Sequence, residues 1–426
     1  MKLVTQFDEF LQNTVNLNAT RVSLLEDSVE TLKSVIRNSE WKPRVAGFSV
    51  QGSWAHKTII RPVAGAAFDA DLVVFVHPVE GWEPKDYVNE LNATLREVAA
   101  YADKTRRYSH CVTVEYAGER KIDIAPCLVD RVSRNSFEVC NRDANRYEMS
   151  NPDAYTSWLV DRNRWSGANS FRKVTRLVKY LRDIKTTFTC PSVLLTTVLA
   201  ERMGQADQGN GEFADVPSAL RTLFQRLDDW LQPRILKPRV GNPVLQQEVL
   251  SDLLTDDQYK NFRNKISTYR GWIDDAYAEP DRAASIVKWR RVFGDEFAKA
   301  VAVDEARRVA VAVAAADGPG GIVSDLVEKV RALGRAALPA VFGQFNYMKQ
   351  PAWRRELQGD LGVLLAATLH GGKGKLVIRD VSPLSVLPKE FWLKFRVQTT
   401  VGLPLSGDYA VQWRVRAVQR SLQSGV

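Results

Sequence analysis

The sequence predicts an α+β protein made of a strand-rich first lobe, a helical second lobe and a small β-rich domain. Residues 44–130 contain four apolar segments with strand character, and a helical segment separates the second from the third. Residues 151–300 show the helical spacing of apolar residues almost throughout. Residues 340–426 return to the alternation that is typical of strands with one buried face.

These changes of pattern set the predicted domain boundaries. We expect a first lobe with an N-terminal helix, a helical lobe, an alanine-rich linker and a β-rich domain over residues 1–165, 166–300, 301–339 and 340–426. The linker prediction depends on "DGPGG" within an alanine-rich segment, because boundaries fall where few contacts cross. The cleft between the first two lobes is the expected ligand site.

The spacing of apolar residues justifies each element in turn. Residues 1–40 are expected as a helix, because Leu24, Leu25, Val29, Leu32 and Ile36 recur at helical spacing. The first-lobe strands are expected in "RVAGFSVQGS", "DADLVVFV", "HCVTVEYAG" and "KIDIAPCLV", with a helix in "KDYVNELNATLREVAAYADK". The clearest second-lobe helices are "FRKVTRLVKYLRDIK" and "SVLLTTVLAERMG". The tail strands are "FWLKFRV" and "YAVQWRVR".

Composition excludes several classes of protein. A chain of 426 residues, 45% hydrophobic and 26% charged, is long enough for two or three domains and is not expected to be disordered. Its net charge of +9 suits an anionic partner such as a nucleotide. The four cysteines form no CxxC pair, so neither a zinc site nor a disulfide framework is indicated.

The sequence also predicts the cellular compartment of the protein. Its N-terminal residues lack the basic-then-apolar signature of a signal peptide. The longest apolar run, "VAVAVAAA" at residues 309–316, is too short to span a bilayer. We therefore expect a soluble, cytoplasmic protein with no membrane partner.

Three aspartates form the most informative pattern. Asp69 and Asp71 lie two residues apart in a strand, so their side chains share one face. Asp123 lies between Ile122 and Ile124, so it opposes the buried face of its own strand. If the two strands are neighbours, the three carboxylates converge and require a counter-charge. Carboxylates that converge in this way predict a site for Mg²⁺.

A Gly-Ser turn precedes these acids. Gly52 allows the backbone to approach a ligand closely, and the Ser53 hydroxyl and the turn's N–H groups are suited to phosphate oxygens. A Gly-Ser pair alone is common in turns, and two aspartates two residues apart are common on solvated strand faces. Together, a phosphate-binding turn and a carboxylate cluster that holds metal are what nucleotidyl transfer requires.

Over residues 5–300 the sequence resembles the polymerase-β-like nucleotidyltransferases. It looks most like the bacterial cGAS/DncV-like enzymes (CD-NTases) of CBASS anti-phage systems. The resemblance rests on "QGSWAHKTIIRP", "DADLVVFV", "KIDIAPCL", "NPDAYTSWL", "FRKVTRLVKYLRDIK", "PSVLLTTVL" and "KWRRVFGDEF". It implies a bilobal fold with a helical second lobe, and residues 340–426 look like the C-terminal sensor domain of some of these cyclases.

The resemblance also implies an activity. In the family, the Gly-Ser turn and three acids bind Mg²⁺ (or Mn²⁺) and a nucleoside triphosphate. The enzyme joins nucleotides, without a nucleic-acid template, into a cyclic di- or trinucleotide. That product activates a separate effector protein encoded nearby. Asp69, Asp71 and Asp123 would then be both the catalytic and the metal-binding residues.

Two further nucleotide contacts follow from the resemblance. Lys179 matches the family's triphosphate-binding lysine, although Arg172, Arg176 and Lys179 also form what looks like a solvated basic helix face. Ser192 resembles a second phosphate contact in the first turn of the next helix, although it is equally typical of a simple helix start.

Two alternative functions stay open on the sequence. The same acids would serve a nucleotidyltransferase that modifies RNA or protein. The second alternative is a catalytically dead nucleic-acid sensor. The intact acids argue against it, and the sequence lacks the clustered basic runs with interleaved aromatics that a nucleic-acid groove would need.

Overall fold

The computed structural model describes residues 1–63, 67–117, 120–301, 363–370, 378–381 and 392–399, the last three segments by their backbone. The chain divides into two compact units, Met1–Asp317 with Val330–Val341 and Gly318–Lys329 with Phe342–Val426. The predicted linker lies, from residue 302 onward, outside the described residues.

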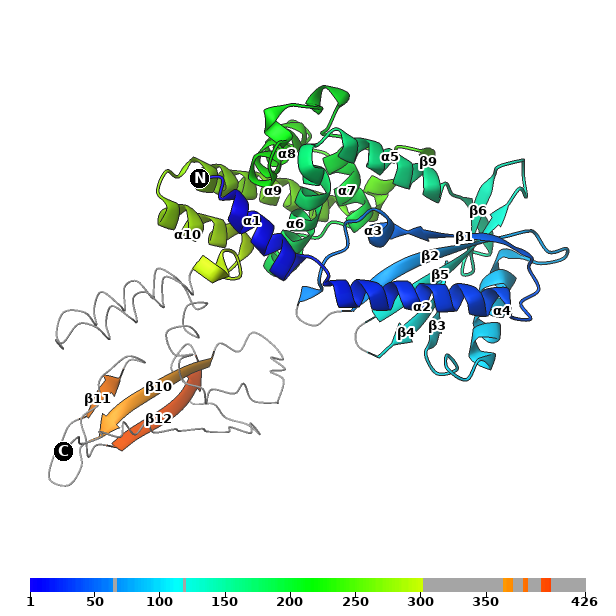
Figure 1. The fold of residues 1–426 in the computed structure, drawn as a ribbon, viewed down its shortest axis with the longest axis horizontal. Coiled ribbons are helices and arrows are strands. Elements are labelled where there is room, and N and C mark those ends of the chain that lie inside the picture. The colour runs from blue at the N-terminus through cyan, green and yellow to red at the C-terminus, as the bar shows by residue number, and fades with distance from the viewer. Residues whose placement is uncertain (64–66, 118–119, 302–362, 371–377, 382–391, 400–426) are drawn as a thin grey trace, which may run out of the picture. The chain divides into compact units, whose positions relative to one another are not determined.

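A mixed seven-stranded sheet forms the first lobe (Figure 1). Its strands are β1 Val45–Gln51, β2 Phe68–Val76, β3 Thr105–Arg107, β4 Val112–Tyr116, β5 Arg120–Val129, β6 Phe137–Asn141 and β7 Arg146–Met149. The order is β1-β2-β5-β4-β3, with β6 beside β5 and β7 beside β6. Strands β2 and β5 pair in parallel, and the other described pairs of this sheet are antiparallel.

The two faces of this sheet differ because side chains alternate along each strand. Helices α2 Ala19–Arg37 and α4 Pro84–Glu97 pack on one face, against Ala70 and Leu72 of β2 and Ile122 and Ile124 of β5. The aspartates of β2 and β5 alternate with these buried residues. They therefore lie on the opposite face, as the sequence predicts.

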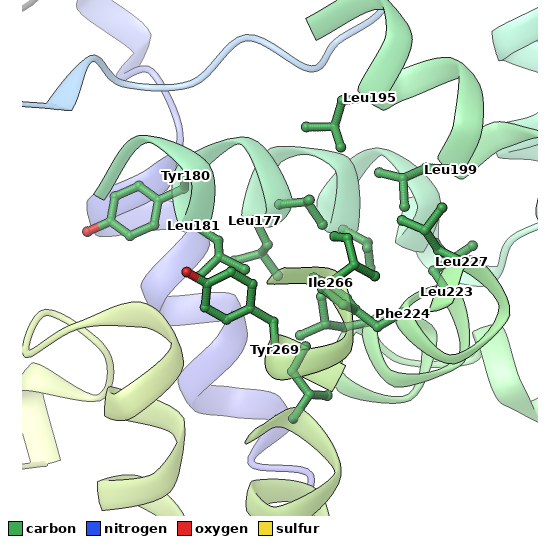
Figure 2. Packing of buried hydrophobic residues seen from close by; sticks show 14 of the residues in the cluster. Leu177, Tyr180, Leu181, Leu195, Leu199, Leu223, Phe224, Leu227, Ile266 and Tyr269 are labelled. Carbon is green, nitrogen blue, oxygen red and sulfur yellow. The ribbon is translucent and has the colours of Figure 1, made fainter. Parts of the chain in front are cut away.

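Helices make up most of the second lobe. They are α5 Pro152–Arg164, α6 Ser170–Lys185, α7 Ser192–Ala200, α8 Val216–Leu231, α9 Asp256–Ala278 and α10 Arg282–Phe293, with short 3₁₀ turns at Gly167–Asn169, Gln205–Asp207, Gly211–Phe213 and Leu250–Leu253. Figure 2 shows their common core, in which Leu177 and Leu181 of α6 face residues such as Leu199, Phe224 and Ile266. A small hairpin, β8 Gly241–Asn242 and β9 Leu245–Val249, interrupts the helices and was not predicted.

The N-terminal segment corrects the prediction of one helix over residues 1–40. Helix α1 Val4–Phe10 continues into a π-helical turn, Leu11–Val15, and then stops. Asn16 is extended and bridges Ile60, and the side chain of Asn18 caps α2 by accepting from the Arg21 N–H at 2.8 Å. Asparagine favours such caps over helix interiors, so the two asparagines explain the break.

The break lets the two helices serve different lobes. α2 packs on the sheet, whereas Phe7 of α1 is fully buried among helical-lobe rings. The ring centroid of Phe7 lies 4.8 Å from that of Trp289 and 4.9 Å from that of Phe297. α1 therefore anchors the start of the chain in the second lobe.

The second unit contains a three-stranded antiparallel sheet. Its central strand β10 Val363–His370 pairs with β11 Ile378–Val381 on one side and β12 Trp392–Thr399 on the other. β12 confirms the strand predicted in "FWLKFRV". The strand predicted in "YAVQWRVR" lies outside the described residues, and the sensor role stays a prediction. Among the described helices, none combines the length and apolar character of a membrane span.

The role of α1 predicts a stability effect. Phe7→Ala should lower the free energy of unfolding by about 3–5 kcal/mol, because it removes a buried ring and leaves a cavity. Val4→Ala is the matched control, since Val4 of the same helix is 38% exposed and should change stability by less than about 0.5 kcal/mol. Denaturant unfolding of both variants checks this, and equal effects would contradict the anchoring role of α1.

Candidate active site

The Gly-Ser turn lies directly against one of the predicted acids. Strand β1 ends at Gln51, and the chain turns into the short helix α3 Gly52–Ala55. Gly52 has φ +66°, which glycine adopts without strain. A Cβ atom at Gly52 would lie 1.7 Å from Oδ2 of Asp71. This position therefore requires glycine, both for its backbone angle and for the close approach of Asp71.

Strand register brings the three aspartates together. Asp71 is paired with Gln51 on one side and with Asp123 in the parallel strand on the other. Asp69 lies two residues before Asp71, on the same face. Carboxylate oxygens of Asp69, Asp71 and Asp123 all lie within 4.8 Å of one another, so the predicted convergence is confirmed.

The cluster is electrostatically unfavourable without a counter-charge. Burial raises the pKa of Asp71 to about 7, and the charges of Asp69 and Asp123 add to this shift while Lys179 opposes it. Burial also raises the pKa of Asp123, although the Thr113 hydroxyl donates a hydrogen bond to its Oδ1. The three carboxylates therefore favour a bound proton or a bound cation.

A cleft of about 1090 Å³ opens beside the cluster, with walls from both lobes. It is lined by six of the seven predicted site residues, Gly52, Ser53, Asp69, Asp71, Lys179 and Ser192. Asp123 is not among the lining residues and lies behind Asp71 on the next strand. The structure thus brings all the predicted residues to one region.

Lys179 is buried, whereas a solvated helix face would leave it exposed to solvent. Its side chain is only 4% exposed, and Nζ donates to the carbonyl oxygen of Thr58 at 3.2 Å and to its hydroxyl at 3.1 Å. The Thr58 N–H in turn donates to the Ser53 carbonyl at 2.8 Å. Burial, with Arg182 nearby, lowers the pKa of Lys179 to about 8. Lys179 thus supports the segment that follows the Gly-Ser turn.

Ser192 begins α7, as predicted, and has a partner that the sequence analysis missed. Nη1 of Arg182 donates to the Ser192 hydroxyl at 3.1 Å and to the Cys190 carbonyl at 2.8 Å. Arg182 also lines the cleft and forms an ion pair with Asp183 at 2.7 Å. Arg182 follows Lys179 by three residues on α6, and this helical spacing was the available signal.

A polar network that was not predicted ties the Gly-Ser turn to α5. Nε2 of Gln51 donates to the Asp153 carboxylate at 3.1 Å and to the Ser49 hydroxyl at 2.8 Å. The Ser49 hydroxyl donates to the same carboxylate at 2.6 Å. Thr156 donates to Oε1 of Gln51 at 3.4 Å and contacts the His56 ring nitrogen at 3.2 Å. Because Tyr155 and Leu159 of α5 pack in the core of the helical lobe, this network links the two walls of the cleft.

The raised pKa of Asp71 predicts a pH-dependent cost to stability in the metal-free protein. Below pH 3.8 the group is protonated in both folded and unfolded chains. As pH rises to about 7, the unfolded chain releases this proton first, so stability is lost across that window. Asp71→Asn should therefore raise the melting temperature in EDTA at pH 8, by about 2–4 °C per kcal/mol relieved, and change it little near pH 4.

Thermal melts of the wild-type protein and of Asp71→Asn, recorded from pH 4 to pH 8 in EDTA, provide the measurement. Asp27→Asn on the exposed face of α2 is the matched control and should give no pH-dependent difference. A melting temperature of Asp71→Asn that is unchanged or lower at pH 8 would argue against a strained carboxylate cluster.

Comparisons with known proteins agree with this geometry. Residues 1–163 match the SMODS family, the Second Messenger Oligonucleotide or Dinucleotide Synthetase domain. A c-di-GMP synthase of Roseivirga ehrenbergii is 23% identical over 53% of this chain and 66% of its own length. A cyclic AMP-AMP-AMP synthase of an Acinetobacter species is 21% identical over 70% of this chain and 86% of its own length.

Solved structures show the same fold. A structure of E. coli MS115-1 CdnC with ATP superposes with a TM-score of 0.56 at 18% identity, over 69% of this chain and 98% of the other. The bilobal polymerase-β-like nucleotidyltransferase fold expected from the sequence is thereby confirmed. The SMODS match over residues 1–163, the two relatives and the shared fold together support a nucleotidyltransferase of the cGAS/DncV-like family, the CD-NTases.

Proposed function

We propose that this protein joins nucleoside triphosphates into a cyclic di- or trinucleotide second messenger, using a divalent cation held by Asp69, Asp71 and Asp123. The observation that carries the proposal is the convergence of these three carboxylates within 4.8 Å, beside a glycine turn at the wall of a large cleft. The three aspartates and the Gly-Ser turn lie within residues 1–163, which match the SMODS family.

The three carboxylates fit a hard divalent cation. Their ligand atoms are all oxygens, which Mg²⁺ and Mn²⁺ prefer, and burial together with the charges of Asp69 and Asp123 raises the pKa of Asp71 despite the opposing charge of Lys179. When bound, Mg²⁺ (or Mn²⁺) supplies charge stabilisation for the in-line displacement at phosphorus. The cluster therefore supports a metal-dependent transfer.

The residues of the chain position the two reacting groups. A 3′- or 2′-hydroxyl of one nucleotide attacks the α-phosphorus of another, a P–O bond forms, and pyrophosphate leaves. Asp123 would accept the hydroxyl proton, because its raised pKa suits a general base better than a fully exposed carboxylate does. A second transfer of the same kind closes the ring.

The triphosphate would lie against the turn and the cationic wall of the cleft. The Ser53 hydroxyl and the N–H groups of α3 are suited to phosphate oxygens. Arg182 and Ser192 lie on the opposite wall, and Lys179 acts either directly or through Thr58. These contacts include the predicted nucleotide-binding residues Gly52, Ser53, Lys179 and Ser192.

The wider role follows from the family. The two curated relatives make different products, c-di-GMP and cyclic AMP-AMP-AMP, so neither ring size nor base identity transfers to this chain. We infer a template-independent cytoplasmic enzyme whose product activates an effector protein encoded nearby in anti-phage defence. Residues 340–426 would carry the regulatory signal.

Removing charge from the cluster should abolish synthesis. The double substitution Asp69→Asn and Asp71→Asn keeps side-chain size and should reduce product formation by at least about 100-fold, since electrostatic stabilisation of the transition state is lost. Asp123→Asn alone should also be severe. The measurement is incubation with labelled ATP, GTP, CTP and UTP plus Mg²⁺ or Mn²⁺, followed by identification of any phosphatase-resistant product.

The control for this experiment is Asp27→Asn, which removes an exposed carboxylate from α2. It should retain the wild-type rate. A double variant that still forms product at a near wild-type rate would overturn the catalytic assignment, whereas a labelled RNA or protein in place of a small product would favour the other transferase reading.

The turn offers a second, sterically based test. Gly52→Ala would place a methyl group against Oδ2 of Asp71 and strain the backbone at φ +66°. Product formation should fall by at least about 10-fold, and the stabilisation of the protein by ATP with Mg²⁺ should weaken. Gly47→Ala in the preceding strand β1 is the control, because a Cβ there meets nothing within 4 Å. Equal activities of the two variants would contradict the proposed role of the turn.

A further inference from the structure

The β8–β9 hairpin forms part of the cleft wall. Asn242, Leu245 and Glu248 of this hairpin line the cleft together with Tyr155 of α5. Glu248 lies close enough to Tyr155 that, after burial, its charge helps to raise the pKa of that hydroxyl to about 12. The hairpin therefore presents a carboxylate and an amide to whatever occupies this side of the cleft.

Glu248 differs from the other acids of the cleft. The described lining residues include four carboxylates, Asp69, Asp71, Asp183 and Glu248. The first two belong to the metal cluster, and Asp183 is paired with Arg182. Within the described part of the chain, Glu248 has no cationic partner and accepts only from a neutral amide.

That amide holds the carboxylate in a defined orientation. Nδ2 of Asn242 donates to Oε2 of Glu248 at 2.7 Å, and Oδ1 of Asn242 accepts from the Val244 N–H at 3.0 Å. The two bonds fix which end of the amide faces Glu248. Oε1 of Glu248 and the remaining acceptor capacity of Oε2 are therefore available to a ligand.

Charge determines which part of a nucleotide can lie here. An uncompensated carboxylate repels a triphosphate, so the phosphates belong at the metal cluster and at Arg182. The hairpin that carries Glu248 also contributes the half-buried apolar side chain of Leu245 to the cleft lining, and such a surface suits the flat face of a base. The base of a bound nucleotide, rather than its phosphates, would then lie beside Glu248.

We propose that Glu248, oriented by Asn242, selects guanine at this position of the cleft. Among the four common bases, only guanine presents two adjacent N–H donors, N1–H and the 2-amino group, to a carboxylate. Uracil places its N3–H between two carbonyl oxygens that repel a carboxylate, and adenine and cytosine each offer a single amino group. This inference rests on the proposed function and specifies guanine as one of the bases that the enzyme would bind.

Inosine triphosphate provides a direct test, because it differs from GTP only by lacking the 2-amino group. Equilibrium dissociation constants are measured for the α,β-methylene analogues of GTP and ITP with Mg²⁺, so that no turnover interferes. The wild-type chain should bind the GTP analogue roughly tenfold more tightly, as expected for a hydrogen bond to a charged acceptor. Glu248→Gln should bring that ratio close to one, and Asn242→Ala should lower it.

Gln247→Ala is the matched control, since Gln247 is an exposed hairpin residue outside the cleft lining, and it should leave the ratio unchanged. Equal affinities of the wild-type chain for the two analogues, or a ratio that survives Glu248→Gln, would overturn guanine selection while leaving the synthase proposal intact. Failure of the wild-type chain to bind either analogue, together with no product from any triphosphate mixture, would instead reject the proposed function and this inference with it.

Discussion

The repulsion among three carboxylates on two adjacent strands is the constraint on which the rest of the site depends. Asp69 and Asp71 cannot point away from Asp123, because the parallel register of β2 and β5 sets Asp71 opposite Asp123. The apolar residues between the acids are buried under α2 and α4, so a shift of one residue would expose the core. The sheet thus holds together charges that would separate in solution, and burial together with the charges of Asp69 and Asp123 raises the pKa of Asp71.

The residues around this cluster hold the phosphate-binding groups in fixed positions beside it. Gly52 brings the turn against Asp71, and the Gln51–Asp153 hydrogen bond fixes that turn to the helical lobe. Lys179 fixes the following segment through Thr58. The cleft therefore has its anionic cluster, its backbone donors and its cationic wall held in one arrangement before any ligand binds, and such preorganisation is what phosphoryl transfer needs.

Much of this site could be predicted from the sequence because it follows from local rules. Period-two alternation placed Asp69, Asp71 and Asp123 on the face opposite the core, and the Gly-Ser pair marked the turn. Several contacts that were missed act across long sequence separations. Asp153 contacts β1 from about 100 residues away, and the predicted residue Lys179 donates to Thr58 at a separation of 121 residues. The break at Asn16 was missed because the helical spacing of residues 24–36 was extended back to residue 1, and tertiary packing on two lobes decided the outcome.

The central claim is that the three carboxylates hold a divalent cation beside the nucleotide. Crystals grown with Mn²⁺ and a non-hydrolysable triphosphate, measured at the manganese absorption edge, test it most directly. The account predicts an anomalous peak bounded by carboxylate oxygens of Asp69, Asp71 and Asp123, with the triphosphate extending along the Gly52–Ser53 turn. A triphosphate bound in the cleft with no manganese peak at these three residues would contradict it.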